Sequence, residues 1–153
     1  MIDIAKGFKM NIIAYDPYPN LDHEGYTYVS LPTLLESSDI ISLHCPLSKD
    51  TKYILDKNAF KKMKKNAILV NVARGPVVDE QALYTALTEN MIGGAGLDVL
   101  EKEPMSVDNP LANYKDSRKL IITPHMAWAS VEARTRCMQE VYKGIYSPSG
   151  KGK

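Results

Sequence analysis

The segment from Ala67 to Glu80, AILVNVARGPVVDE, constrains the fold more than any other part of the chain. It begins with four consecutive apolar residues, a pattern typical of a β-strand buried on both faces of a parallel sheet. The apolar run ends at Asn71, and Arg74 follows three residues later. In open α/β sheets, ligands bind outside the carboxyl ends of the strands. The segment therefore predicts a buried strand that is followed by Arg74 at the carboxyl edge of the sheet. Arg74 then lies either in a binding site or in an ordinary loop.

Composition and charge narrow the class of protein. The 153 residues are 44% apolar and 24% charged, which suits one globular domain. A formal charge of +1 gives no electrostatic case for nucleic acid or an anionic membrane, so a small molecule is the expected partner. Cys45 and Cys137 lie far apart, and we find no signal peptide or membrane-length apolar run, so we expect a reduced, cytoplasmic protein. The three histidines lack metal-ligand spacing, so no metal site is expected.

Strand-like and helix-like segments alternate along the chain with short connections. Strands are predicted over residues 11–15, 26–29, 40–44, 67–71, 95–99 and 120–123. Helices are predicted over residues 2–9, 31–37, 57–63, 80–90 and from 130 onward, with Ser30, Asp56 and Asp79 as N-caps. Cys137 falls on the apolar stripe of the last helix, which predicts a core residue rather than a nucleophile. The alternation predicts an α/β fold with a doubly wound, mostly parallel, Rossmann-like sheet.

The predicted strands end in residues that can carry chemistry. These residues are, in chain order, Asp16, Cys45 with Pro46, Arg74, Asp98 with Glu103 just beyond it, and His125. Because the carboxyl ends of parallel strands meet at one edge of a sheet, we expect these groups to converge there.

The chemistry of this set is that of hydride transfer to a 2-keto acid. A histidine beside a carboxylate forms a general acid/base pair, and Arg74 can bind a carboxylate through two parallel hydrogen bonds. Asp16 stands where a dinucleotide site accepts ribose hydroxyls and repels a 2′-phosphate. Taken singly, each residue has a structural alternative: Asp16 as a turn residue, Glu103 as a loop charge, and His125 as a core histidine.

Four blocks of sequence resemble consecutive blocks of the D-isomer-specific 2-hydroxyacid dehydrogenases. They are ISLHCPLSKDTKYIL, LVNVARGPVVDEQAL, GGAGLDVLEKEP and LIITPHMAWAS, in that order. The resemblance covers roughly residues 1–146, and the HMAWAS segment is most similar to glycerate dehydrogenases, also called hydroxypyruvate reductases. It implies an NAD-dependent oxidoreductase that reduces a 2-keto acid, such as hydroxypyruvate or glyoxylate, to a D-2-hydroxy acid.

The resemblance also implies roles for individual residues. His125 becomes the proton donor to the keto oxygen, Glu103 its carboxylate partner, and Arg74 the group that binds the carboxylate and carbonyl of the substrate. Trp128 is implied near the substrate or in a dimer contact, although an isolated tryptophan also suits a core. The implied cofactor-binding residues are Asp16, which favours NAD over NADP, Cys45, Pro46, Thr51, Val72, Ala73, Arg74, Asp98 and His125.

Two parts of the family pattern do not occur in this sequence. The glycine-rich turn Gly-x-Gly-x-x-Gly, with the strand before it, is one, and the substrate domain is the other. We therefore expect residues 1–146 to form a partial dinucleotide-binding domain that is truncated at the N-terminus, with residues 147–153 as a disordered tail. Loss of a central strand predicts that the strands at 11–15 and 40–44 separate from the other three, leaving the isolated chain marginally stable and inactive.

Two other functional classes are compatible with the same residues. A corepressor-like interaction module would keep the NAD contacts while using an outer surface for protein partners. A catalytically inactive remnant would keep the site residues without turnover. Formate and phosphoglycerate dehydrogenases are neighbours within the enzyme class, and a homodimer is expected by analogy with relatives.

Overall fold

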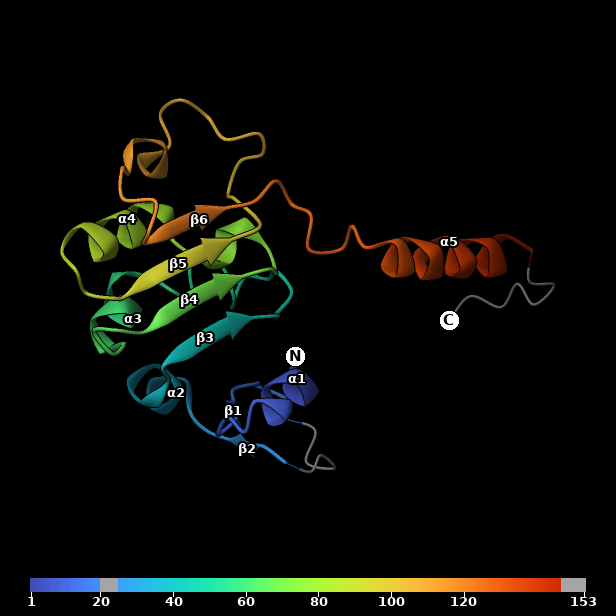
Figure 1. Ribbon diagram of the computed structural model, residues 1–153, viewed down its shortest axis with the longest axis horizontal. Coiled ribbons are helices and arrows are strands. Elements are labelled where there is room, and N and C mark those ends of the chain that lie inside the picture. Colours follow the sequence, from blue (N-terminus) through green and yellow to red (C-terminus); the bar gives the residue numbers. More distant parts are fainter. Residues whose placement is uncertain (20–24, 147–153) are drawn as a thin grey trace.

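A computed structural model describes residues 1–19 and 25–146 of the chain (Figure 1). The strands are β1 (Ile13–Ala14), β2 (Thr27–Tyr28), β3 (Ile40–Leu43), β4 (Ile68–Asn71), β5 (Gly94–Leu97) and β6 (Leu120–Ile122). The helices are α1 (Ile2–Gly7), α2 (Leu31–Ser37), α3 (Lys57–Lys62), α4 (Glu80–Thr88) and α5 (Val131–Tyr146), with short 3₁₀ turns η1 (Gly75–Val77) and η2 (Pro110–Asn113). The order of elements predicted from the sequence is confirmed. The expectation for residues 147–153 lies outside the described residues.

The strands form two parallel sheets. Strands β3, β4, β5 and β6 pair in that order, so that Ile41 lies opposite Leu69, Leu69 opposite Ala95, and Ala95 opposite Leu120. Strands β1 and β2 form a separate parallel pair. All strand pairs among the described residues are parallel, and α3 and α4 connect β3 to β4 and β4 to β5, so the predicted doubly wound α/β class is confirmed.

The predicted grouping of the strands is wrong in one respect. The strand at residues 40–44 does not stay with the strand at 11–15, because β3 pairs with β4 along its whole length. The partner of β1 is β2 instead. The chain therefore crosses from one sheet to the other through α2, which follows β2, rather than after β3.

Side-chain caps fix where three helices begin. Ser30, Asp56 and Asp79 precede α2, α3 and α4, and the side chain of each accepts hydrogen bonds from backbone N–H groups of the first turn. Such caps satisfy donors that the helix itself leaves unpaired. The three predicted N-caps are thus confirmed.

The hydrophobic core lies between the four-stranded sheet and helices α3 and α4. Leu69 at the centre of β4 is fully buried, as are Phe60 of α3 and Leu83 of α4. Because side chains alternate along a strand, the core side of the sheet also carries Ile41 and Leu97.

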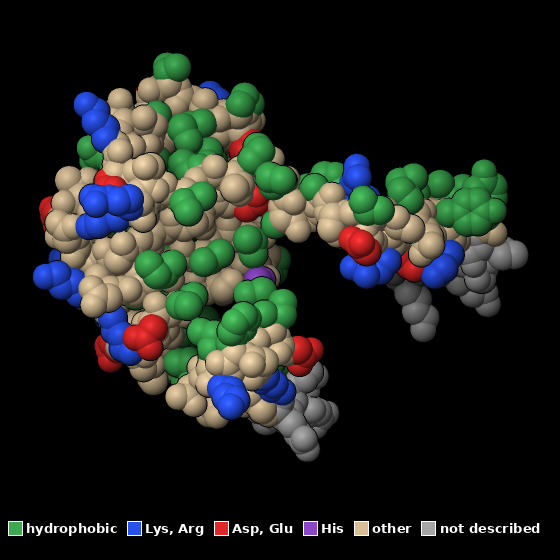
Figure 2. Space-filling view, in the orientation of Figure 1, with side chains coloured by type: hydrophobic (Ala, Val, Ile, Leu, Met, Phe, Trp, Pro, Cys, Tyr) green, Lys and Arg blue, Asp and Glu red, His purple; other side chains and the backbone are tan. Residues whose placement is uncertain are grey.

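The opposite face of the sheet is partly open, which corrects the prediction of strands buried on both faces. Ile40 is 51% exposed, Ile68 39% and Ile121 62%. The helices α3 and α4 cover only the core side of the sheet, so alternate residues of β3, β4 and β6 face solvent. Figure 2 shows hydrophobic side chains gathered over the region of the sheet and along α5.

Helix α5 projects away from the body of the domain (Figures 1 and 2). No residue of α5 is buried, and Cys137 is exposed together with Met138, Val141 and Ile145 of its apolar stripe. The prediction that Cys137 is a core residue is therefore wrong, because an apolar stripe does not specify what covers it. No helix within the described part of the chain is long and apolar enough to cross a membrane.

The asymmetry of the sheet predicts unequal effects for two adjacent residues of β4. Leu69→Ala removes side-chain atoms from the sealed core side and should lower the free energy of unfolding by about 3 kcal/mol. Ile68→Ala, on the partly open face, should lower it by no more than about 1 kcal/mol. Urea denaturation of the two variants measures both values. Equal losses would contradict the assignment of the core side.

Candidate functional site

The loops that follow β3, β4, β5 and β6 leave the same edge of the four-stranded sheet (Figure 1). They bring together the predicted site residues Cys45, Pro46, Val72, Ala73, Arg74, Asp98, Glu103 and His125. Asp16 follows β1 in the separate two-stranded sheet. The predicted convergence at the carboxyl edge is therefore found for the four-stranded sheet, with Asp16 approaching from its neighbour.

A hollow opens between the loops after β3 and β4. It is lined by His44, Cys45, Pro46, Leu47, Val72, Ala73 and Arg74. Burial raises the pKa of the Cys45 thiol, and the negative charge of Asp16 acts in the same direction. The thiol therefore stays neutral, and Arg74 supplies the positive charge of the lining.

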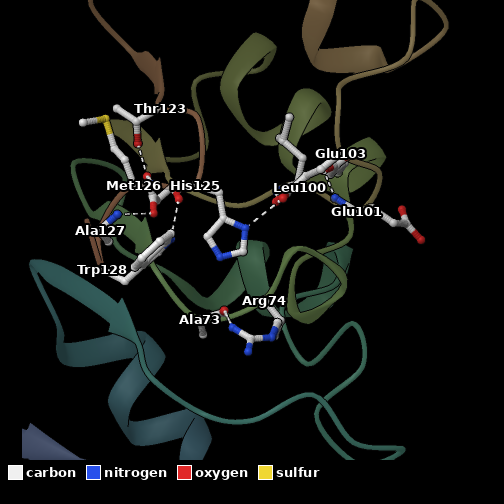
Figure 3. A network of polar contacts seen from close by, with 12 residues as sticks. Ala73, Arg74, Leu100, Glu101, Glu103, Thr123, His125, Met126, Ala127 and Trp128 are labelled. Atoms are coloured by element: carbon white, nitrogen blue, oxygen red, sulfur yellow. Dashed lines mark hydrogen bonds and ion pairs between the residues drawn. The ribbon is translucent and has the colours of Figure 1, made fainter. Parts of the chain in front are cut away.

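The loop that carries Arg74 is held by Asn71, the last residue of β4. The Asn71 side chain is buried; its Oδ1 accepts the Ala73 N–H at 3.0 Å, and its Nδ2 donates to the Arg74 carbonyl oxygen at 3.0 Å. Nη1 of Arg74 donates to the Ala73 carbonyl oxygen at 2.7 Å (Figure 3). Arg74 is exposed, and a guanidinium has five N–H donors, so most of the charged group can meet an anionic ligand.

Glu103 and His125 form an ion pair. Nδ1 of His125 lies 2.8 Å from Oε2 of Glu103, and the imidazole points toward this carboxylate in Figure 3. The other carboxylate oxygen accepts the Leu100 N–H at 2.9 Å. The Leu100 N–H and the His125 ring together hold the pKa of Glu103 below its ordinary value. A carboxylate bound at Nδ1 favours the imidazolium and leaves Nε2 to exchange a proton with a ligand.

The backbone around His125 is organised by Asp98. Asp98 is buried and accepts hydrogen bonds from Thr123 Oγ1 at 2.5 Å, the Met126 N–H at 2.9 Å and the Ala127 N–H at 2.7 Å. Burial would raise the pKa of Asp98, but these hydrogen bonds outweigh it and lower the pKa, so the group is ionised. His125 itself has a φ of 50°, in the left-handed region. The implied role of Asp98 as a cofactor-binding residue stays a prediction.

Trp128 is exposed, which excludes the core alternative. Its Nε1–H donates to the His125 carbonyl oxygen at 2.9 Å, so the indole supports the histidine loop (Figure 3). Thr51 closes the loop after β3, because its hydroxyl donates to the Pro46 carbonyl oxygen at 2.7 Å. Asp16 is exposed and accepts the Tyr18 N–H at 2.8 Å.

Sequence reasoning missed the supporting role of Asn71. The signal was present, because a polar residue that ends an apolar strand is a candidate for binding the following loop. Within residues 1–19 and 25–146, no group of three or more His, Cys, Asp or Glu side chains is arranged to hold a metal ion.

Residues 1–127 match the family model described as D-isomer specific 2-hydroxyacid dehydrogenase, NAD binding domain. The chain belongs to this family. It is 45% identical over 144 residues to a glyoxylate reductase of Korarchaeum cryptofilum, covering 92% of this chain and 42% of that protein. It is 47% identical over 129 residues to a glycerate dehydrogenase of Methylorubrum extorquens, covering 84% of this chain and 39% of that protein.

The fold of the chain matches solved structures of the family. D-Lactate dehydrogenase from Aquifex aeolicus, complexed with NAD and lactic acid, aligns with a TM-score of 0.85 and 32% identity. The alignment covers 94% of this chain and 47% of that one. The chain thus spans less than half the length of these relatives, and the resemblance to the D-2-hydroxyacid dehydrogenases is confirmed.

The residues present fit the NAD of this dehydrogenase family. A hollow at the carboxyl edge of a parallel sheet, with Pro46, Val72 and Ala73 in its lining, suits a nicotinamide, and the exposed carboxylate of Asp16 suits ribose hydroxyls. Cys45, Pro46, Val72 and Ala73 line the hollow and are the groups that would contact the cofactor there. Bound NADH supplies a hydride.

The ion pair predicts how stability depends on pH. Because the pKa of Glu103 in the folded chain lies below its ordinary value of 4.5, its carboxylate contributes stability that is fully present above pH 4.5. The contribution is lost as the pH falls from there through the folded-state pKa. The difference in unfolding free energy between wild type and Glu103→Gln should therefore shrink on acidification. Denaturant titrations at several pH values measure it.

The control for this titration is Glu36→Gln, at an exposed position on α2. The difference in unfolding free energy between Glu36→Gln and wild type should vary little with pH. A Glu103→Gln difference that grows below pH 4.5 would contradict the predicted sign.

Proposed function

We propose that this chain provides the NAD-binding and acid/base part of an enzyme that reduces a small 2-keto acid to a D-2-hydroxy acid. The observation that carries the proposal is the ion pair of Glu103 with His125 at 2.8 Å, on the same sheet edge as Arg74. A proton donor with a fixed carboxylate partner and an exposed guanidinium matches the needs of a keto acid, which has a carbonyl to protonate and a carboxylate to bind.

Each residue has a separate proposed role in the reaction. Arg74 binds the carboxylate of the keto acid and polarises its carbonyl. His125 donates a proton from Nε2 to the keto oxygen, while Glu103 stabilises the imidazolium and keeps the ring oriented through Nδ1. Asp16 binds ribose hydroxyls of the cofactor and disfavours a 2′-phosphate, so the preferred cofactor is NAD.

The names of the relatives support a short 2-keto acid as substrate. The two curated relatives are named glyoxylate reductase and glycerate dehydrogenase, and the solved neighbour is a D-lactate dehydrogenase. Their substrates share a carboxylate beside a carbonyl or hydroxyl carbon. We therefore propose hydroxypyruvate or glyoxylate as the substrate for the complete enzyme.

Cofactor binding tests the first half of the proposal. The 153-residue chain should bind NADH more tightly than NADPH, because Asp16 repels a 2′-phosphate. Asp16→Ala should weaken NADH binding and reduce the difference between the affinities for NADH and NADPH. Fluorescence titration of the reduced cofactors measures both effects. Equal affinity for NADH and NADPH in the unmodified chain would contradict the assignment of Asp16.

Turnover tests the second half. His125→Asn removes the proton donor and should lower the rate of hydroxypyruvate or glyoxylate reduction by roughly 10²–10⁴-fold, with little change in NADH affinity. Glu132→Gln, on the exposed face of α5, is the matched control and should keep the wild-type rate. NADH oxidation at 340 nm follows the reaction. NADH binding without turnover in the unmodified chain would favour the inactive remnant.

A further inference from the structure

A buried carboxylate outside the proposed set of reacting residues holds the loop that carries Glu103. Glu80 is the first residue of α4 and is only 6% exposed. Its Oε1 accepts the Glu101 backbone N–H at 2.7 Å, and its Oε2 accepts Nδ2 of Asn109 at 2.7 Å. The two partners stand on either side of Glu103 in the sequence, so one side chain binds both ends of the loop.

The burial of the Glu80 carboxylate costs free energy that its hydrogen bonds must offset. None of the ion pairs found among the described residues includes Glu80. A buried carboxylate without a cation is costly unless hydrogen bonds replace its water, and here each oxygen has such a bond. Both hydrogen bonds are 2.7 Å long, which suits the task of fixing a loop.

A close backbone approach acts together with Glu80. A Cβ atom at Gly75 would lie 1.9 Å from the Leu100 carbonyl carbon, so only glycine allows the Arg74 loop to lie against the start of the Glu103 loop. Leu100 is also the residue whose N–H binds Glu103. At the other end of the loop, Asn109 Oδ1 accepts the Leu111 N–H at 2.9 Å and begins η2.

We propose that Glu80 is a positioning residue that holds the 100–109 loop in the one arrangement in which Glu103 meets His125. The inference deepens the proposed function, on which the acid/base role of the pair rests. The same logic applies elsewhere in the site, since two further buried polar side chains, Asn71 and Asp98, bind the loops of Arg74 and His125.

The test is the pKa of Glu103, measured by carbon-13 NMR of its side-chain carboxyl carbon in the full 153-residue chain. Glu80→Ala frees both ends of the loop, so the Leu100 and His125 contacts weaken and the pKa of Glu103 should rise toward its ordinary value. Glu89→Ala, which changes an exposed glutamate at the end of the same helix, is the matched control and should leave the pKa of Glu103 unchanged.

A second pair of variants distinguishes a positioning role of Glu80 from general destabilisation of the fold. This pair tests the proposal even where Glu80→Ala fails to fold. Glu80→Gln turns one acceptor into a donor that faces the Asn109 amide, so one of the two bonds is lost and the pKa of Glu103 should rise. Adding Asn109→Asp restores an acceptor for that donor and keeps the bond to the Leu111 N–H. The double variant should therefore return the pKa of Glu103 to its wild-type value.

The outcomes are distinguishable from those of the proposed function. A wild-type pKa of Glu103 in the Glu80→Gln variant, or no recovery in the double variant, would overturn the positioning role. Neither readout needs cofactor, substrate or turnover. An inactive chain would therefore refute the proposed activity while the role of Glu80 is still decided by the NMR titration.

Discussion

Hydrogen bonds from buried polar side chains to loop backbones are the interaction on which the candidate site depends. The parallel sheet brings the loops to one edge, but it does not determine the path of each loop beyond its strand. That path is set by Asn71, Asp98 and Glu80, each of which replaces lost water contacts with backbone or amide donors. Arg74, Glu103 and His125 are exposed, whereas the residues that hold their loops are buried.

The charges at the edge are arranged asymmetrically around His125. Glu103 contacts the imidazole ring, and Asp98 binds the backbone that follows it; both have pKa values below the ordinary range, so both are anionic at neutral pH. Arg74 lies in the lining of the hollow instead. Negative charge thus lies beside His125, and positive charge faces the space where an anionic ligand would enter.

Helix caps and the convergence of strand ends at one edge were predictable from the sequence, whereas the pairing and covering of individual elements were not. Ser30, Asp56 and Asp79 were identified as caps because a cap depends on residues within one turn. The partner of β3 and the exposure of Ile68 and Cys137 were missed, because they depend on which elements pack together. The convergence of Glu103 and His125 was predicted from their places at strand ends, but the choice of Glu103 as the partner of His125 came from family resemblance, since 22 residues separate them.

The left-handed backbone of His125 places a side chain at a position where the backbone conformation favours glycine. Few residues with a Cβ adopt a φ of 50°, and histidine, asparagine and aspartate do so more often than the others, whereas glycine adopts that conformation freely. Stability of the backbone alone would therefore favour glycine at this position. His125 therefore places an imidazole at a position with an unfavourable backbone conformation. The hydrogen bonds from the following backbone to Asp98 and from the Trp128 indole to the His125 carbonyl oxygen offset this conformational cost.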